Sequence, residues 1–318
     1  NTIGMPLTAL QMGYDTEAAV FEMGMNHFGE ISKMAACGQP DIAVITNIGT
    51  SHIGNLGSRE GICKAKLEIT EGLAERGGCA VLSADEPLLW EKRQEFQFPV
   101  FWFGIDNPQA VIRAENLRQT EGGVDFDLCW KLARYPAHLN LPGCHNVMNA
   151  LAAAAAGFIV GLDPDQVTAG LAGLRDRDTH AKVYERGGYH IYEDVYNASP
   201  DAVLAVLRSF GAIPAARRFA ALGGMLELGG YAREGHMAAG RAAASCCDGL
   251  YLYGAHAEDI RDGAVEAGLP PERVGIYETH EQLAQALRRD ASPGDALLFK
   301  GSHAMDMGRA LALFFDEG

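Results

Sequence analysis

Between residues 189 and 315 the sequence repeats one pattern five times, a short apolar segment followed by an amphipathic one. The apolar segments, such as YHIYED (189–194) and DALLFKGS (295–302), have the composition of buried strands, and the segments after them, such as HEQLAQALRRD (280–290), have the apolar spacing of helices. Strands that alternate with helices form parallel sheets, because each connecting helix covers a face of the sheet. The pattern therefore predicts a doubly wound, Rossmann-like domain in the C-terminal part of the chain.

The first half of the chain shows the same alternation with one interruption. We expect strands at 18–24, 41–49, 77–85 and 98–104, and helices at 30–40, 58–76, 146–162 and 163–174. Residues 109–140 instead alternate apolar and polar positions around a Glu-Gly-Gly turn, which is typical of an antiparallel insertion. The predicted fold class is α/β: a mostly parallel sheet with helices on both faces and an antiparallel insertion, followed by the Rossmann-like domain.

A polar stretch, RDRDTHAK (175–182), separates the two halves and is expected to be a hinge. We place the domains at 1–178 and 179–318. A chain of 318 residues is long enough for two such cores.

Charge and cysteine usage narrow the class of protein. The formal net charge of −15 argues against non-specific binding to nucleic acid or to anionic membranes, because phosphate repels such a surface. The seven cysteines include no C-x-x-C pair, no apolar run reaches 18 residues, and no signal peptide begins the chain. We therefore expect reduced thiols in a cytoplasmic protein without membrane insertion. Because the sequence starts abruptly at Asn1, we also expect a longer protein with a further N-terminal part.

Two polar residues stand where buried segments of the first half end. Glu22 lies near the end of the apolar segment at 18–24, and His52 lies in the glycine-containing turn after 41–49. Ligands of open α/β sheets bind beyond the carboxyl ends of the strands. One carboxylate and one imidazole leave coordination positions open to water. This is typical of a Mg²⁺ site and not of a zinc site closed by protein ligands. Taken singly, each residue is equally compatible with a structural role.

Lys66 raises a separate question. In the helix predicted at 58–76, an apolar stripe is formed by Ile62, Ala65, Ile69 and Leu73. Lys66 lies at the edge of this stripe, whereas Lys64 points to solvent. From the helix alone, Lys66 either packs its stem and extends its ammonium to water, or serves a site. The sequence contains no G-x-x-x-x-G-K-[ST] phosphate loop, no H-E-x-x-H, and no G-x-G-x-x-G after a strand.

Six segments, in this order, resemble the Mur ligases of peptidoglycan synthesis: FEMGMNHFGEI, TNIGTSHIGNLGSREGICKAKLEI, LPGCHNVMNALAAAAA, EDVYNASPDAV, LGGMLELG and KGSHAMDM. The resemblance covers essentially the whole chain, and its most specific parts are the His-to-Lys segment and YNASPD. It implies a central ATP-binding domain without its phosphate loop and without the UDP-binding domain that precedes it, followed by the C-terminal domain. Within the family, it is strongest to the members that add D-alanyl-D-alanine to UDP-N-acetylmuramoyl-tripeptide.

The resemblance implies roles for particular residues. Lys66 would be carbamylated by CO₂, which converts an ammonium into an anion suited to a position near two Mg²⁺ ions. Glu22 and His52 would be Mg²⁺ ligands, and His52 and Lys66 would be catalytic. The residues expected to contact the nucleotide are His145, Asn146, Asn149, Asp194, Tyr196, Asn197 and Pro200.

The activity implied by the resemblance is ATP-dependent amide formation. ATP would phosphorylate the terminal carboxylate of the tripeptide, and the amine of D-alanyl-D-alanine would attack the acyl phosphate, with Mg²⁺ screening the anionic reactants. This reaction serves cell-wall synthesis, and through it cell shape, cell division and the cell cycle. We expect a cytoplasmic monomer that acts on these small molecules and binds no nucleic acid. Without the phosphate loop, the 318 residues alone are expected to be inactive.

This sequence departs from the family pattern at several positions. Gly224 stands where relatives usually have aspartate, and His303 stands where they have arginine. The arginine that the hinge commonly supplies has no clear counterpart; the nearby candidates are His180, Lys182, Arg175 and Arg177. Two alternatives therefore stay open. One is a Mur or folylpolyglutamate-type ligase with another acceptor, although YNASPD and LELG favour the dipeptide-adding members. The other is a nucleotide-binding or scaffold paralogue without catalysis.

Overall fold

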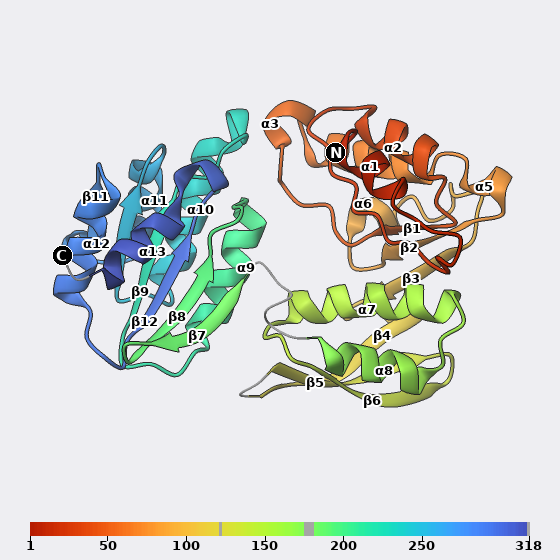
Figure 1. Ribbon diagram of the computed structural model, residues 1–318. Helices are drawn as coiled ribbons and strands as arrows, with labels where there is room; N and C mark the ends of the chain where they lie inside the picture. Colours follow the sequence, from red (N-terminus) through yellow and green to blue (C-terminus); the bar gives the residue numbers. More distant parts are fainter. Residues whose placement is uncertain (121–122, 175–180, 317–318) are drawn as a thin grey trace. The chain divides into compact units, whose positions relative to one another are not determined.

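The computed structural model describes residues 1–120, 123–174 and 181–316. The chain divides into two compact units, residues 1–174 and 175–318 (Figure 1). Each unit is an α/β domain built on a mixed, mostly parallel six-stranded sheet, so the predicted fold class is confirmed. The candidate hinge residues 175–180, and with them the predicted boundary after residue 178, lie outside the described residues.

The first unit contains a sheet in the strand order β1-β2-β3-β4-β5-β6. Its strands are β1 (Ile42–Ile45), β2 (Cys79–Ser83), β3 (Val100–Gly104), β4 (Ile112–Thr120), β5 (Gly123–Trp130) and β6 (Ala133–Leu139). Strands β1 to β4 run parallel, whereas β5 and β6 pair antiparallel with their neighbours. The antiparallel insertion predicted at 109–140 is therefore confirmed.

The helices of the first unit surround this sheet. They are α1 (Gly4–Ala9), α2 (Glu30–Gly38), α3 (Ile53–Leu56), α4 (Arg59–Leu67), η1 (Glu68–Thr70), α5 (Leu73–Arg76), α6 (Pro87–Trp90), α7 (Cys144–Ile159) and α8 (Pro164–Gly173). Helix α7 packs across β1 to β4, and its buried alanines let it approach the sheet closely. As expected, it stops before Gly161, whose φ of 98° is left-handed. Asp163 caps α8 by accepting a hydrogen bond from Gln166 N at 2.8 Å.

Two expectations for the first unit were wrong. Residues 18–24 form no strand, and Val20 is 98% exposed. Among the described residues β1 has a neighbouring strand on one side only, so this apolar segment has no strand to pair with. The single helix predicted at 58–76 is instead α4, η1 and α5, because Gly72 adopts a left-handed φ of 73° before α5.

The second unit contains a sheet in the order β11-β10-β9-β12-β8-β7. Its strands are β7 (Lys182–Arg186), β8 (Tyr189–Asp194), β9 (Arg218–Gly223), β10 (Gly249–Tyr253), β11 (Val274–Tyr277) and β12 (Ala296–Lys300). All neighbours are parallel except β7 and β8. Strand β12 lies between β8 and β9, so the chain order switches there, and in doubly wound sheets this switch point opens a crevice at the carboxyl ends.

Each strand–helix unit predicted for the second half is present. The helices are α9 (Pro200–Gly211), η3 (Gly229–Tyr231), α10 (Ala232–Ala244), α11 (Ala257–Glu266), η4 (Pro271–Arg273), α12 (His280–Asp290), η5 (His303–Met305) and α13 (Met307–Phe315). Strand β7 was not predicted, because its side chains are mostly exposed and lack an apolar alternation. None of the described helices combines the length and apolarity needed to span a bilayer.

Candidate active site

In the first unit, helix α4 holds the loop that follows β1. Lys66 Nζ donates a hydrogen bond to Asn47 O at 2.8 Å. Arg59, at the start of the same helix, donates from Nη2 to Ile48 O at 2.8 Å. Lys66 is thus half-buried and directed at the loop that leads to His52, while Lys64 is exposed as predicted.

Arg59 also connects this loop to the end of the next strand. Its Nη2 lies 2.8 Å and 3.0 Å from the two carboxylate oxygens of Glu86, which follows β2 and whose side chain is only 10% exposed. A charge-assisted pair with one buried partner is stronger than a surface pair. Arg59 therefore positions the loop containing His52, a role that the sequence analysis missed. The only sequence signal was an arginine directly after the helix cap at Ser58.

The other end of α4 anchors the segment that follows Glu22. Glu68, two residues after Lys66, accepts hydrogen bonds from Gly29 N at 2.8 Å and from Ser32 N at 3.1 Å. These amides belong to the start of α2, where a carboxylate also interacts favourably with the helix dipole. Helix α4 and its continuation η1 are thereby tied to both segments that contain the predicted metal ligands.

The two predicted metal ligands differ in burial and in backbone conformation. His52 is half-buried and has a left-handed φ of 61° at the cap of α3. Glu22 is exposed on a segment without regular structure. Within the described residues, no cluster of three or more His, Cys, Asp or Glu side chains is arranged to hold a metal. Mg²⁺ commonly takes only one or two protein ligands and completes its shell with water and phosphate oxygens. A Mg²⁺ site at Glu22 and His52 is compatible with this donor set and stays a prediction.

The start of α7 contains three of the predicted nucleotide contacts. Asn146 Nδ2 donates to Pro142 O at 2.8 Å and closes the helix start, and His145 is half-buried. Asn149 follows one turn later and is exposed, so its amide is accessible to a ligand. Asn146 thus has a structural role, and its contact with the nucleotide stays a prediction.

In the second unit, the carboxyl end of β12 places a lysine inside the protein. Lys300 is 2% exposed, and its Nζ lies 2.6 Å from Asp194 Oδ2 and 2.9 Å from Asn197 O. Lys300 and Asp194 are register partners at the last positions of their strands. Burial lowers the pKa of Lys300, and the charge of Asp194 opposes this shift. Asp194 was predicted to contact the nucleotide; the structure shows it paired with Lys300, which the sequence analysis did not select.

The other predicted residues of this unit follow β8. Tyr196 is 57% exposed, and its ring centroid lies 6.3 Å from that of His303, which is also exposed. Asn197 is fixed through its carbonyl by Lys300, and Pro200 is the buried first residue of α9. Tyr196, Asn197 and His303 are all exposed here, whereas Pro200 is buried.

Gly224, which the sequence analysis singled out, lies where a side chain would collide with the backbone. A Cβ built on Gly224 would lie 2.4 Å from Ala255 O. Its carbonyl accepts a hydrogen bond from Ser302 N at 3.2 Å, and Ser302 Oγ accepts one from Leu226 N at 2.9 Å. The loop after β9 is thus packed against the loop after β10 and bonded to the segment after β12.

A buried histidine fixes the same loop. His236 is 0% exposed; its Nε2 accepts a hydrogen bond from Met225 N at 2.8 Å, and its Nδ1 donates to Ala232 O at 2.6 Å. This pattern requires the neutral ring with the proton on Nδ1. Burial lowers the pKa of His236, and the ring of His256, stacked at 4.6 Å, acts in the same direction.

With this geometry in hand, comparison with known proteins decides the family. Residues 1–157 match the Mur ligase middle domain, and residues 180–303 match the Mur ligase glutamate ligase domain. A relative from Synechocystis, named UDP-N-acetylmuramoyl-tripeptide–D-alanyl-D-alanine ligase, is 33% identical over 100% of this chain and 67% of its own length. The chain belongs to the Mur ligase family. The Bacillus subtilis relative of the same name is 37% identical over 96% of this chain and 66% of its own length.

Solved structures of the Mur ligase family agree with this assignment. MurF from Acinetobacter baumannii superposes with a TM-score of 0.89 at 25% identity, covering 98% of this chain and 68% of that one. MurF from Thermotoga maritima, solved in complex with ADP, gives a TM-score of 0.85 at 26% identity, covering 99% and 71%. The chain spans about two thirds of the length of the Bacillus subtilis and Synechocystis relatives.

Proposed function

We propose that this chain forms the ATP-binding and C-terminal parts of a ligase that joins D-alanyl-D-alanine to UDP-N-acetylmuramoyl-tripeptide. The similarity to the Bacillus subtilis ligase, 37% identity over 96% of the chain, carries the proposal. The reaction would proceed in the cytoplasm, on small-molecule substrates, in the service of peptidoglycan synthesis and thereby of cell shape, cell division and the cell cycle. We propose a monomer that binds neither nucleic acid nor membrane.

In the first unit we assign the chemistry to Lys66 and the two predicted metal ligands. Carbamylation leaves one hydrogen on Nζ, so the hydrogen bond to Asn47 O can persist while the new carboxylate points away. Glu22 and His52 would hold Mg²⁺, which screens the charge of the reacting phosphate and carboxylate groups when bound. The positioning of the His52 loop by Arg59 supports this assignment.

Nucleotide binding is assigned to residues of both units. Asn149, with His145 and Asn146, would border the nucleotide from the start of α7. Tyr196 offers an exposed ring on which a base can stack. Asp194, Asn197 and Pro200 would shape the segment behind it. The Lys300–Asp194 pair supports this role by fixing the backbone of Asn197.

The test is a ligation assay on the protein encoded by the complete gene. We expect ADP release to require both UDP-N-acetylmuramoyl-tripeptide and D-alanyl-D-alanine, and we expect mass spectrometry to show the pentapeptide product. Product formation with a single amino acid such as glutamate, and not with the dipeptide, would instead support a ligase with another acceptor.

A non-catalytic paralogue remains a second candidate, favoured by Gly224 and His303. At Gly224 the side chain that relatives carry has no room, as the contact of 2.4 Å with Ala255 O shows. The same assay separates the candidates. Nucleotide binding without ADP release, in the presence of both substrates, would favour the paralogue.

A further inference from the structure

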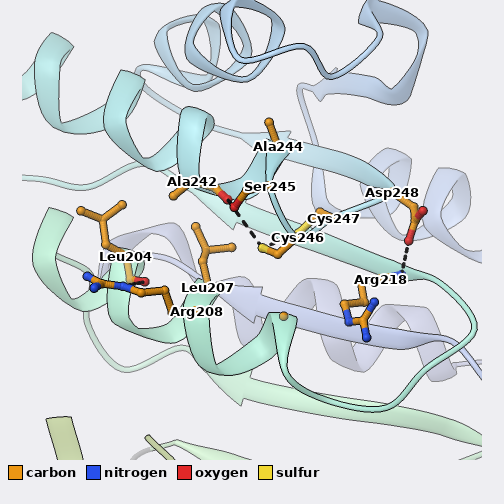
Figure 2. A pocket seen from close by; sticks show the side chains of 11 residues that line it. Leu204, Leu207, Arg208, Arg218, Ala242, Ala244, Ser245, Cys246, Cys247 and Asp248 are labelled. Atoms are coloured by element: carbon orange, nitrogen blue, oxygen red, sulfur yellow. Dashed lines mark hydrogen bonds between the residues drawn. The ribbon is translucent and has the colours of Figure 1, made fainter. Parts of the chain in front are cut away.

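The second unit has a cavity at the end of its sheet opposite to the Lys300 edge. The cavity has a volume of about 640 Å³ and lies between the C-terminal ends of α9 and α10 and the amino ends of β9 and β10 (Figure 2). Leu204 and Leu207 form an apolar wall, and Arg208, Arg218 and Cys246 contribute polar groups. None of these residues belongs to the candidate active site.

Cys246 is half-buried against this cavity, and a second thiol lies beside it. Its Sγ lies 3.7 Å from Sγ of Cys247, which is only 7% exposed. Space next to Cys246 depends on Gly211 at the end of α9, because a Cβ there would lie 2.9 Å from Cβ of Cys246. Cys246 thus lines the cavity while its thiol donates to Ala242 O at 3.6 Å and to Ala243 O at 3.7 Å, and Cys247 is shielded from solvent (Figure 2).

Two of the three charged side chains that line the cavity are arginines, so the cavity favours an anionic ligand. Arg218 donates from Nη2 to Ile213 O at 2.6 Å, but its Nε is buried and has no hydrogen-bond partner among the described residues. Arg208 bonds only weakly to its own helix, through Nε to Leu204 O at 3.3 Å. The one acidic side chain lining the cavity, Asp248, is engaged by the backbone N–H of Arg218 at 2.8 Å. Arg208 and Arg218 therefore line the same cavity as the Cys246 thiol, and of these two arginines it is Arg218 whose charge acts on that thiol.

The two thiols are electronically unequal. The hydrogen bond between the two thiols lowers the pKa of Cys246 against the effect of burial, and the positive charge of Arg218 adds to this. The same hydrogen bond, together with burial, raises the pKa of Cys247. Thiolate character thus concentrates on the sulfur that faces the cavity, which is the form that attacks disulfides.

We propose that Cys246 is a thiol–disulfide exchange site for small disulfides that carry carboxylate groups. The Cys246 thiolate attacks one sulfur of the small disulfide and forms a new S–S bond. The old S–S bond breaks, and the other half leaves as a thiolate that takes up a proton from water. Arg208 and Arg218 bind the carboxylates of the incoming molecule.

The mixed disulfide is the end product, since Cys247 is poorly placed to displace it. The Cα atoms of successive residues are about 3.8 Å apart, which is less than the roughly 4.4–6.8 Å that disulfides usually span. Cys247 instead assists by donating its hydrogen bond to the Cys246 sulfur.

The experiment treats the 318-residue chain with oxidised glutathione, a disulfide that carries carboxylates, and locates adducts by intact mass and peptide mapping. We expect Cys246 to be modified several-fold faster than Cys37 and Cys144, although those two are the exposed thiols. Preferential modification of Cys37 or Cys144 would overturn the proposal. Loss of two thiols without addition of glutathione would also overturn it, because Cys246 and Cys247 would then have formed a disulfide with each other.

Variants test the two features that define the site. We expect Arg208→Gln to slow the reaction with oxidised glutathione and to leave that with the uncharged bis(2-hydroxyethyl) disulfide nearly unchanged. We expect Cys247→Ala to slow both reactions and Cys247→Ser, which keeps a donor, to slow them less. Far-UV circular dichroism and a urea titration confirm that each variant is folded. The role of the arginines would be contradicted if the unmodified protein reacted equally fast with both disulfides and if Arg208→Gln changed neither rate.

Discussion

At the carboxyl edge of the second sheet, Lys300 and Asp194 end adjacent parallel strands, so the register alone brings them together. At the carboxyl edge of the first sheet, Lys66 lies on a helix and reaches the loop after β1 through Asn47 O. The first arrangement is set by strand pairing, whereas the second depends on contacts that hold a loop, including that of Arg59 to Ile48 O.

The difference predicts whether a substitution at each edge changes stability or activity. A buried ion pair between strand ends is part of the fold, and removing one partner leaves an uncompensated charge inside the protein. Lys66 is half-buried and bonds to a backbone carbonyl of a loop, so its removal leaves Asn47 O without this donor but leaves no buried carboxylate behind. Substitutions at the second edge should therefore lower stability, and those at the first edge should lower activity.

The largest effect on stability is expected for Lys300→Met. Asp194, whose side chain is 14% exposed, would lose its partner, and we expect a loss of about 3–5 kcal/mol. Urea denaturation of the 318-residue chain measures it. Lys92→Met is the matched control, because Lys92 forms an exposed pair with Glu95 and should change stability by less than about 1 kcal/mol.

A companion variant separates loss of the ion pair from loss of packing. Lys300→Met combined with Asp194→Leu replaces both charges with apolar groups and should recover much of the lost stability. If the single and double variants are equally unstable, the buried charge is not the cause.

For Lys66→Ala, at the edge of the first sheet, we expect a large loss of activity and a small loss of stability. In the protein encoded by the complete gene, ligation should fall by at least about 100-fold, the size of effect seen when a preorganised electrostatic group is removed. Loss of the hydrogen bond to Asn47 O should lower stability by about 1 kcal/mol. Lys64→Ala, on the exposed side of α4, is the control. Ligation at a normal rate in Lys66→Ala would exclude a catalytic role for this lysine.

The contrast between the edges also explains what the sequence could predict. In the second unit, strands such as β8 and helices such as α12 match the predicted ranges closely, because local periodicity and burial agree there. In the first unit, the apolar residues 18–24 have strand composition but no strand beside them among the described residues. A strand needs a partner, and single-segment composition does not supply one.

The candidate site shows the same limit at the level of side chains. The resemblance selected Lys66 and His52, but the roles of Arg59 and Lys300 follow from contacts between residues that are far apart in the sequence. Lys300 ends an apolar strand, where a lysine is unexpected, and that was the available signal. Its partner Asp194 lies 106 positions away, so only the parallel register of β8 and β12 reveals the pair.

A smaller effect is expected at Gly224, which belongs to the second edge. Gly224→Ala places a Cβ 2.4 Å from Ala255 O, and overpacking of this kind typically costs about 1–3 kcal/mol. Gly230→Ala is the control, because a Cβ at Gly230 meets nothing within 4 Å. The comparison is made by urea denaturation. Equal stability of the two variants would mean that the loop after β10 moves aside readily, and that position 224 tolerates a side chain.

The smallest effect concerns the pH dependence set by His236, which holds the loop containing Gly224. The pKa of His236 is lowered in the folded protein, chiefly by burial, whereas an unfolded histidine titrates near a pKa of about 6.5. Between the two values the unfolded chain binds the proton and the folded one does not, so the stability is complete above about pH 6.5 and falls as the pH decreases below it.

Protonation would also place a hydrogen on Nε2, where Met225 N now donates at 2.8 Å, and so release the loop after β9. Each unit of pKa lowering corresponds to roughly 1.4 kcal/mol. The measurement is a series of urea titrations between about pH 5 and 8, with His236→Gln as the reference, because its amide can both accept from Met225 N and donate to Ala232 O. The neighbouring His256 and Asp259 are common to both proteins and cancel in the difference. If wild type and His236→Gln lose stability in parallel as the pH falls, His236 is not the titrating group, and the loop after β9 is held independently of its ring.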